Sequence, residues 1–138
     1  MIVEIIVRFL AALLAVLVIR KKYPNKDHAF WRMGLLIAAL IYVAFAVFGG
    51  FWENLPMELG GVIIYGLFAF LSKKYTLYWL ALGWVLHICW DVFLHSSATT
   101  PYVPDWYAGT CIGFDIVIAG YILYLIYTKL SVKAMATS

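Results

Sequence analysis

The chain has 138 residues, of which 66% are hydrophobic and 12% are charged, and its formal net charge is +3. In soluble domains about a quarter of all residues are charged, so this composition excludes an ordinary water-soluble domain. Several apolar runs approach the roughly 20 residues that a helix needs to cross the hydrocarbon core of a bilayer. We therefore expect an all-α integral membrane protein that forms a single domain over residues 1–138.

Five apolar runs bounded by polar turns predict five transmembrane helices. In chain order they cover residues 2–20, 33–52, 57–73, 76–95 and 108–128. All prolines, at positions 24, 56, 101 and 104, fall between these runs, as expected for helices that no proline interrupts. The first run begins with Glu4 instead of a basic segment and has no evident small-residue cleavage site, so we expect a retained helix and no signal peptide.

The basic residues predict the orientation, because loops that stay in the cytoplasm carry the excess of lysine and arginine. If the five runs alternate across the membrane, nine of the ten basic residues fall on one side, and only Arg8 lies within a helix. The nine are Arg20, Lys21, Lys22, Lys26, Arg32, Lys73, Lys74, Lys129 and Lys133. The expected topology has the N-terminus outside and the C-terminus in the cytoplasm.

The acidic residues collect toward the opposite face. Six of the seven fall in the outer half or the outer loops, namely Glu4, Glu53, Glu58, Asp91, Asp105 and Asp115. At about 1.5 Å per residue, Asp91 lies about 6 Å deeper than His95 and His87 about 12 Å deeper. Asp115 lies about 10 Å below the outer surface by the same measure, so it reaches a depth comparable to that of Asp91 on a neighbouring helix.

The segment "LHICWDVFLH" at residues 86–95 places two histidines and an aspartate four residues apart. This spacing puts His87, Asp91 and His95 along one stripe of a regular helix. An ionised aspartate at the centre of a transmembrane helix costs about 2.5–3.5 kcal/mol on insertion scales, so the stripe should face the interior of the bundle. We expect His87, Asp91 and Asp115 to converge there, with Glu58 as a third carboxylate.

These residue types allow a metal site. Histidine and carboxylate at a spacing of four offer two ligands for a divalent metal such as zinc, and the candidate ligands are His87, Asp91, His95 and Asp115. Because His87 and His95 lie about 12 Å apart along the helix, one ion is not expected to bind both. The better pairs are His87 with Asp91, or Asp91 with His95, completed by Asp115 and Glu58.

The same groups allow acid–base catalysis without a metal. In that interpretation the protein is an enzyme, a hydrolase or an acid–base isomerase, that acts on a lipophilic small molecule at the outer leaflet. Its candidate catalytic residues are Asp91, Asp115, His87 and Glu58. The alternatives are a metal-ion or proton transporter, for which five helices suggest a homodimer, and a polar layer that only fixes helix packing. The lipid bilayer is the expected partner in each case, and no nucleic acid is expected.

The segments "LALGWVLHICWDVFLH" and "TPYVPDWYAGTCIGFDIVIAGYIL" resemble a family of small bacterial membrane proteins of unknown function, DUF6010. The family pattern contains LALGW, HxxWDxxxH, PxxPxWY and CxGFD, and the resemblance covers roughly residues 58–124. It includes His87, Trp90, Asp91, His95, Pro104, Trp106, Tyr107, Cys111 and Asp115. The resemblance implies a multi-pass protein of the bacterial inner membrane, and it implies no reaction. Glu4, Arg8 and the basic loop near residue 22 fall outside the pattern.

Overall fold

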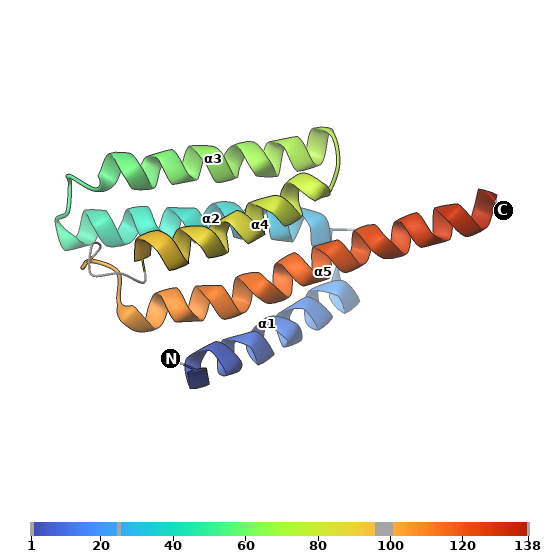
Figure 1. Cartoon of the computed structure of the whole chain (residues 1–138), viewed down its shortest axis with the longest axis horizontal. Helices are drawn as coiled ribbons and strands as arrows, with labels where there is room; N and C mark the ends of the chain where they lie inside the picture. Colours follow the sequence, from blue (N-terminus) through green and yellow to red (C-terminus); the bar gives the residue numbers. More distant parts are fainter. Residues whose placement is uncertain (1, 25, 96–100, 138) are drawn as a thin grey trace.

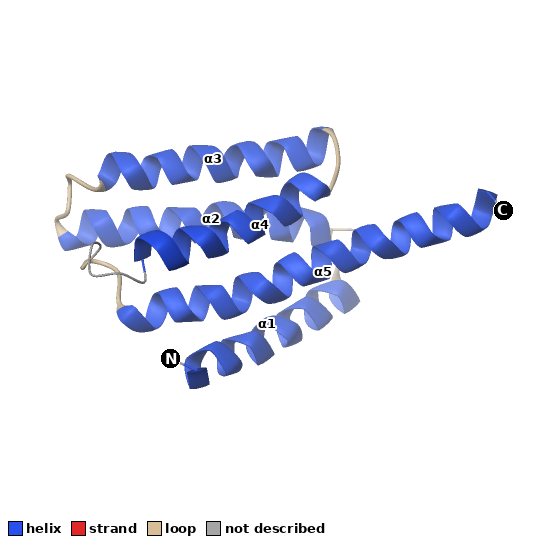
Figure 2. Cartoon of the chain, viewed as in Figure 1, coloured by secondary structure: helices blue, strands red, loops and turns tan. Residues whose placement is uncertain are grey.

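The computed structural model describes residues 2–24, 26–95 and 101–137 (Figure 1). All regular secondary structure in these residues is helical, as the composition predicted (Figure 2). The elements in chain order are α1 (Ile2–Lys22), α2 (Asp27–Gly49), α3 (Leu55–Lys74), α4 (Tyr78–Trp90), a π-helical turn η1 (Asp91–His95) and α5 (Asp105–Thr137).

Four helices are long and apolar enough to cross a membrane. They are α1, α2, α3 and the part of α5 from Asp105 to Lys129. The fourth predicted span corresponds to α4, which has 13 residues, followed directly by the five residues of η1. The chain thus has the helices of a multi-pass membrane protein.

Two helices extend more than five residues beyond the predicted apolar runs. Helix α2 begins at Asp27, where the prediction had residue 33, and α5 continues to Thr137, where it had residue 128. Hydropathy marks the part of a helix that lies in hydrocarbon, and a polar continuation can remain helical in water where no proline or glycine stops it. The apolar pattern therefore underestimates the helix at its polar end.

Glycine and proline define the turn between α2 and α3. The backbone of Gly50 is left-handed, with φ 78°, and its N–H donates to the carbonyl of Val47 while Phe51 N–H donates to Ala46. This is the arrangement by which a glycine closes a helix. Pro56 was expected in the connection but lies in the first turn of α3. A proline is tolerated there because the N–H that it lacks would have no partner within the helix.

The helices lie roughly side by side, with α1 against α5 and α3 on the opposite side of the bundle (Figure 1). Helix α4 packs against both α3 and α5, and α2 packs mainly against α3. The core contains large side chains from α2, α4 and α5, including Leu35, Leu80, Trp84, Ile118 and Ile122. Large apolar side chains on the outer faces, such as Ile63 and Phe93, are exposed, as expected where lipid is the surrounding solvent.

A close backbone contact joins α1 to α5. A β-carbon built on Gly113 would lie 2.7 Å from the carbonyl oxygen of Ile5, a distance that real β-carbons do not adopt. Small residues let membrane helices approach this closely. Gly113 thereby sets the distance between α1 and the helix that carries Asp115.

Candidate active site

Five titratable side chains from four consecutive helical elements are buried together near one end of the bundle. Each is at most 2% exposed. They are Glu58 on α3, His87 on α4, Asp91 and His95 on η1, and Asp115 on α5. Carboxylates and imidazoles are rarely buried so completely without partners, so their mutual contacts define the site.

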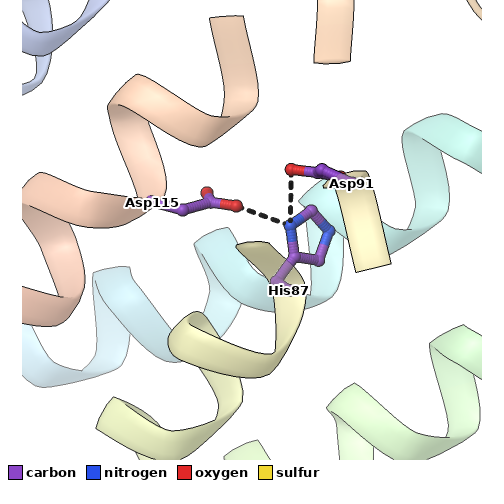
Figure 3. Close-up of side chains that lie close together, drawn as sticks. All are labelled: His87, Asp91 and Asp115. Carbon is purple, nitrogen blue, oxygen red and sulfur yellow. Dashed lines mark hydrogen bonds and ion pairs between the residues drawn. The ribbon is translucent and has the colours of Figure 1, made fainter. Parts of the chain in front are cut away.

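His87 joins the two aspartates. Its Nδ1 lies 2.7 Å from Oδ2 of Asp115 and 3.5 Å from Oδ2 of Asp91, as Figure 3 shows. One potential ligand atom from each of the three residues lies within 4.8 Å of the others. The predicted convergence of His87, Asp91 and Asp115 is confirmed. It arises because α4 and α5 pack against each other and the spacing of four in "HICWD" turns both side chains to that contact.

The second nitrogen of His87 is buried and makes no hydrogen bond to any residue in the described part of the chain. Aromatic rings surround the imidazole: Tyr65 lies edge-on with its ring centroid 5.1 Å away, and Trp84 lies edge-on at 6.4 Å. The hydroxyl of Tyr65 donates instead to the carbonyl of Leu86. Nε2 of His87 is thus a polar atom in apolar surroundings, and it can accept or release a proton.

Tyr42 of α2 is a member of the site that sequence reasoning missed. Its hydroxyl donates to Oδ1 of Asp91 at 2.5 Å, and its ring stacks on His95 with the centroids 3.9 Å apart and the planes 9° apart. It is fully buried. The one available signal was a hydroxyl within the apolar run "LIAALIYVAFAVF", since a buried tyrosine hydroxyl usually needs a partner.

Glu58 and His95 form a second pair. Nε2 of His95 lies 3.3 Å from Oε1 of Glu58, which also accepts a 2.7 Å hydrogen bond from the hydroxyl of Tyr102. Burial raises the pKa of Tyr102 above that of a free tyrosine, and the hydrogen bond to Glu58 is a second, smaller cause of the same shift. The structure therefore brings His95 to Glu58 rather than into the cluster around His87.

The π-helical turn accounts for that separation. The predicted stripe of three residues assumes α-helical spacing throughout, but the chain turns more widely from Asp91 to His95. A π-helix bonds residue i to i+5 and so changes the angle between successive side chains. His87 and Asp91 keep their α-helical relation across the junction, whereas His95 faces α3. Such turns are often found at functional sites.

A cavity of about 340 Å³ reaches Asp115. Its wall is mostly apolar, and Arg8, Thr110 and Asp115 are its principal polar members. The remaining lining residues come from α1, α2, α4 and α5: Ala11, Gly34, Ile37, Ala38, Ile41, Trp84, Tyr107, Cys111 and Phe114. Asp115 thus faces His87 on one side and a largely apolar space on the other.

The comparison with family models gives one match. The model of a family of unknown function, DUF6010, matches residues 2–128. The resemblance drawn from the second half of the sequence is confirmed, and the match extends to the first half, so that Glu4, Arg8 and the basic loop lie within it. No curated protein and no solved structure matches the chain.

Proposed function

The chain belongs to DUF6010, a family of unknown function, and we propose that its buried His87–Asp115 pair performs acid–base catalysis on a lipophilic substrate in the membrane. Hydrolysis and acid–base isomerisation are the simplest classes, because both need only proton transfers at the substrate or at water. One observation supports the proposal above the others. Asp115 is at once the hydrogen-bond partner of His87 and part of the wall of the apolar cavity.

The cavity has the character of a small-molecule site. Such sites measure about 300–1,000 Å³ and combine an apolar lining with a few polar groups, and the volume here is about 340 Å³. A lipophilic molecule in the cavity would meet the carboxylate of Asp115 and the cation of Arg8. We assign Asp115 to proton exchange with the substrate because it is the one member of the cluster that lines this cavity.

The other buried residues support Asp115. His87 orients its carboxylate through the 2.7 Å contact and can hold the proton that Asp115 releases, since a carboxylate beside an imidazole stabilises the imidazolium. Asp91 adds a second negative charge 3.5 Å from the same nitrogen and is itself held by Tyr42. Glu58 acts at greater distance, through His95 and its stack on Tyr42.

The proposal includes five membrane spans with the N-terminus outside, in the bacterial cell membrane. The 13 residues of α4 and the 5 of η1, 18 together, extend about 27 Å at 1.5 Å per residue, close to the hydrocarbon thickness of about 30 Å. The basic residues in the last turns of α1 and α3 lie at the end of the bundle opposite the site. The positive-inside rule assigns that end to the cytoplasm. The cavity then serves molecules of the outer leaflet.

Metal binding is the second candidate, supported by the three ligand atoms within 4.8 Å. We place acid–base chemistry first because two of these residues already share a hydrogen bond. Two ligands of a tetrahedral zinc with bonds of about 2.0 Å lie about 3.3 Å apart, whereas Nδ1 of His87 and Oδ2 of Asp115 are 2.7 Å apart, a hydrogen-bond distance. An ion between them would have to separate the pair.

Isotope labelling tests the reaction. Purified protein in lipid nanodiscs is incubated with a total bacterial lipid extract in water enriched in ¹⁸O or in ²H, and the lipids are followed by mass spectrometry. Hydrolysis adds ¹⁸O to a product, and isomerisation by proton abstraction adds ²H without changing composition. We expect Asp115→Asn to abolish the labelled product. Asp105→Asn, the same change at an exposed position of the same helix, should retain it.

Two results would count against the proposal. If folded Asp115→Asn protein forms the labelled product at the wild-type rate, Asp115 does not exchange the proton. If the purified protein contains stoichiometric zinc that Asp91→Asn and Asp115→Asn lose and Asp105→Asn keeps, the metal site is the better account. Elemental analysis of the same samples measures this.

A further inference from the structure

Another cavity, of about 390 Å³ and with a more polar lining, lies at the basic end of the bundle, away from the histidine–aspartate cluster. Its charged lining residues are Arg32 and Lys129, with His28 beside them, and no carboxylate belongs to the described lining. Ser72, Thr76, Tyr75 and Tyr78 contribute hydroxyls, and Leu77 and Ile126 contribute apolar surface. A neighbouring cavity of about 350 Å³ shares His28, Leu77 and Lys129 and continues along α5.

Arg32 is held in place by a buried serine. Its Nε donates to Oγ of Ser72 at 2.8 Å and its Nη2 donates to the carbonyl of Ser72 at 3.3 Å. The serine hydroxyl in turn donates to the carbonyl of Ala69 at 2.7 Å. These bonds use two of the five N–H groups of the guanidinium and leave three for another acceptor.

Among the side chains that the structure describes, no carboxylate pairs with Arg32, and the ion pairs of the candidate active site do not include it. The side chain is half-buried. A partly buried cation without a carboxylate is costly unless an anion from outside the chain binds to it. Its oriented, unused N–H groups suit the oxygens of a phosphate, which arginine binds with two parallel hydrogen bonds.

We propose that this cavity binds the phosphate of an anionic phospholipid, such as phosphatidylglycerol, from the leaflet at the basic end of the bundle. Arg32 donates hydrogen bonds to the phosphate oxygens, Lys129 supplies a second positive charge, and the hydroxyl of Thr76 is a further hydrogen-bond donor. Tyr75 and Tyr78 are exposed, as aromatic residues at the membrane interface are. Basic pockets between transmembrane helices are a recurring mode of anionic headgroup binding. The inference is independent of the proposed catalysis.

The test measures thermal unfolding by tryptophan fluorescence in nanodiscs of phosphatidylcholine to which phosphatidylglycerol is added. We expect phosphatidylglycerol to raise the unfolding temperature of the wild type. Arg32→Gln and Lys129→Gln should each weaken its apparent affinity by about tenfold or more, the effect of losing a charged hydrogen bond. Lys129 is exposed, so its variant is expected to fold normally. Lys21→Gln removes the same charge from the same end, outside the cavity, and should keep the wild-type response.

Three outcomes would overturn the inference. An equal response to phosphatidylglycerol in the wild type, Arg32→Gln and Lys129→Gln would remove the cavity from lipid binding. An equal loss in Lys21→Gln would assign the effect to the overall charge of that end. Stabilisation by inorganic phosphate equal to that by the lipid, and lost in Arg32→Gln, would assign the cavity to a soluble phosphate compound.

Discussion

The hydroxyl of Tyr42 donates a hydrogen bond of 2.5 Å to Oδ1 of Asp91, and both side chains are completely buried. The bond connects α2 to the π-helical turn. The same tyrosine ring stacks on His95, which pairs with Glu58. Tyr42 therefore joins the pair on α3 and η1 to the cluster that contains Asp115.

Removal of this hydroxyl should destabilise the protein. We expect Tyr42→Phe to lower the free energy of unfolding by about 1–3 kcal/mol, since a buried carboxylate loses its hydrogen-bond donor. The ring and its stack on His95 stay in place. Tyr65→Phe is the matched control, because its hydroxyl donates to the neutral carbonyl of Leu86, and about 0.5–1.5 kcal/mol is expected. Equilibrium unfolding in mixed micelles measures both, and an equal or smaller loss for Tyr42→Phe would contradict the prediction.

His87 and Asp115 should be energetically coupled. In a double-mutant cycle with His87→Gln and Asp115→Asn, we expect the two unfolding free energies to be non-additive by about 0.5–3 kcal/mol, because each single change already breaks the 2.7 Å contact. His87 and Glu58 make no direct contact in the described structure, so in a cycle of His87→Gln with Glu58→Gln the two changes in unfolding free energy should be closer to additive. Additive behaviour of the first pair would show that the contact contributes no coupling.

Replacing either of two glycines of α5 by alanine should change the stability of the protein in opposite directions. Gly113→Ala places a β-carbon 2.7 Å from the backbone of Ile5, so α1 must shift, and we expect a loss of about 1–3 kcal/mol. A β-carbon on Gly120 would meet no atom of the described residues within 4 Å, and Gly120→Ala should stabilise the helix by about 0.5–1 kcal/mol. Circular dichroism during thermal unfolding can compare them. A Gly113→Ala variant as stable as the wild type would refute the close contact.

Because of Tyr102, the stability of the protein should fall as the pH becomes alkaline. Burial and the bond to Glu58 raise its pKa in the folded protein. A raised pKa means that this contribution to stability is complete below the unfolded value of about 10 and falls as the pH rises above it. The wild type should thus lose more unfolding free energy between pH 8 and pH 11 than Tyr102→Phe does. Tyr75→Phe, at an exposed position, should behave as the wild type. An unchanged pH slope in Tyr102→Phe would contradict the role of the bond.

The placement of the cluster followed from the sequence because two physical rules act locally. Apolar runs identify helices, and charged groups in such runs turn inward because lipid is a poor solvent for them. With a spacing of four, His87 and Asp91 had to share a face, and Asp115 lay at a matching depth. To apply these rules, one needs to assume only that consecutive helices, here α4 and α5, are neighbours.

The missed features depend on tertiary contacts. The hydroxyl of Tyr42 within an apolar run signals that it needs a partner but does not identify that partner, which depends on the contact between α2 and η1. The π-helical turn has no spacing signature in "DVFLH". Tyr102, in the loop before α5, is buried and bonds to Glu58 through a contact that the sequence does not indicate.

Helix α1 packs mainly along α5, and its buried residues are only Ala12 and Val16. It nevertheless contributes Arg8 and Ala11 to the wall of the cavity that reaches Asp115. Under the proposed function, the α1 side of this cavity is therefore a route by which a lipophilic substrate in the bilayer reaches the carboxylate. Such a route lies in the membrane plane, so the substrate would stay out of water.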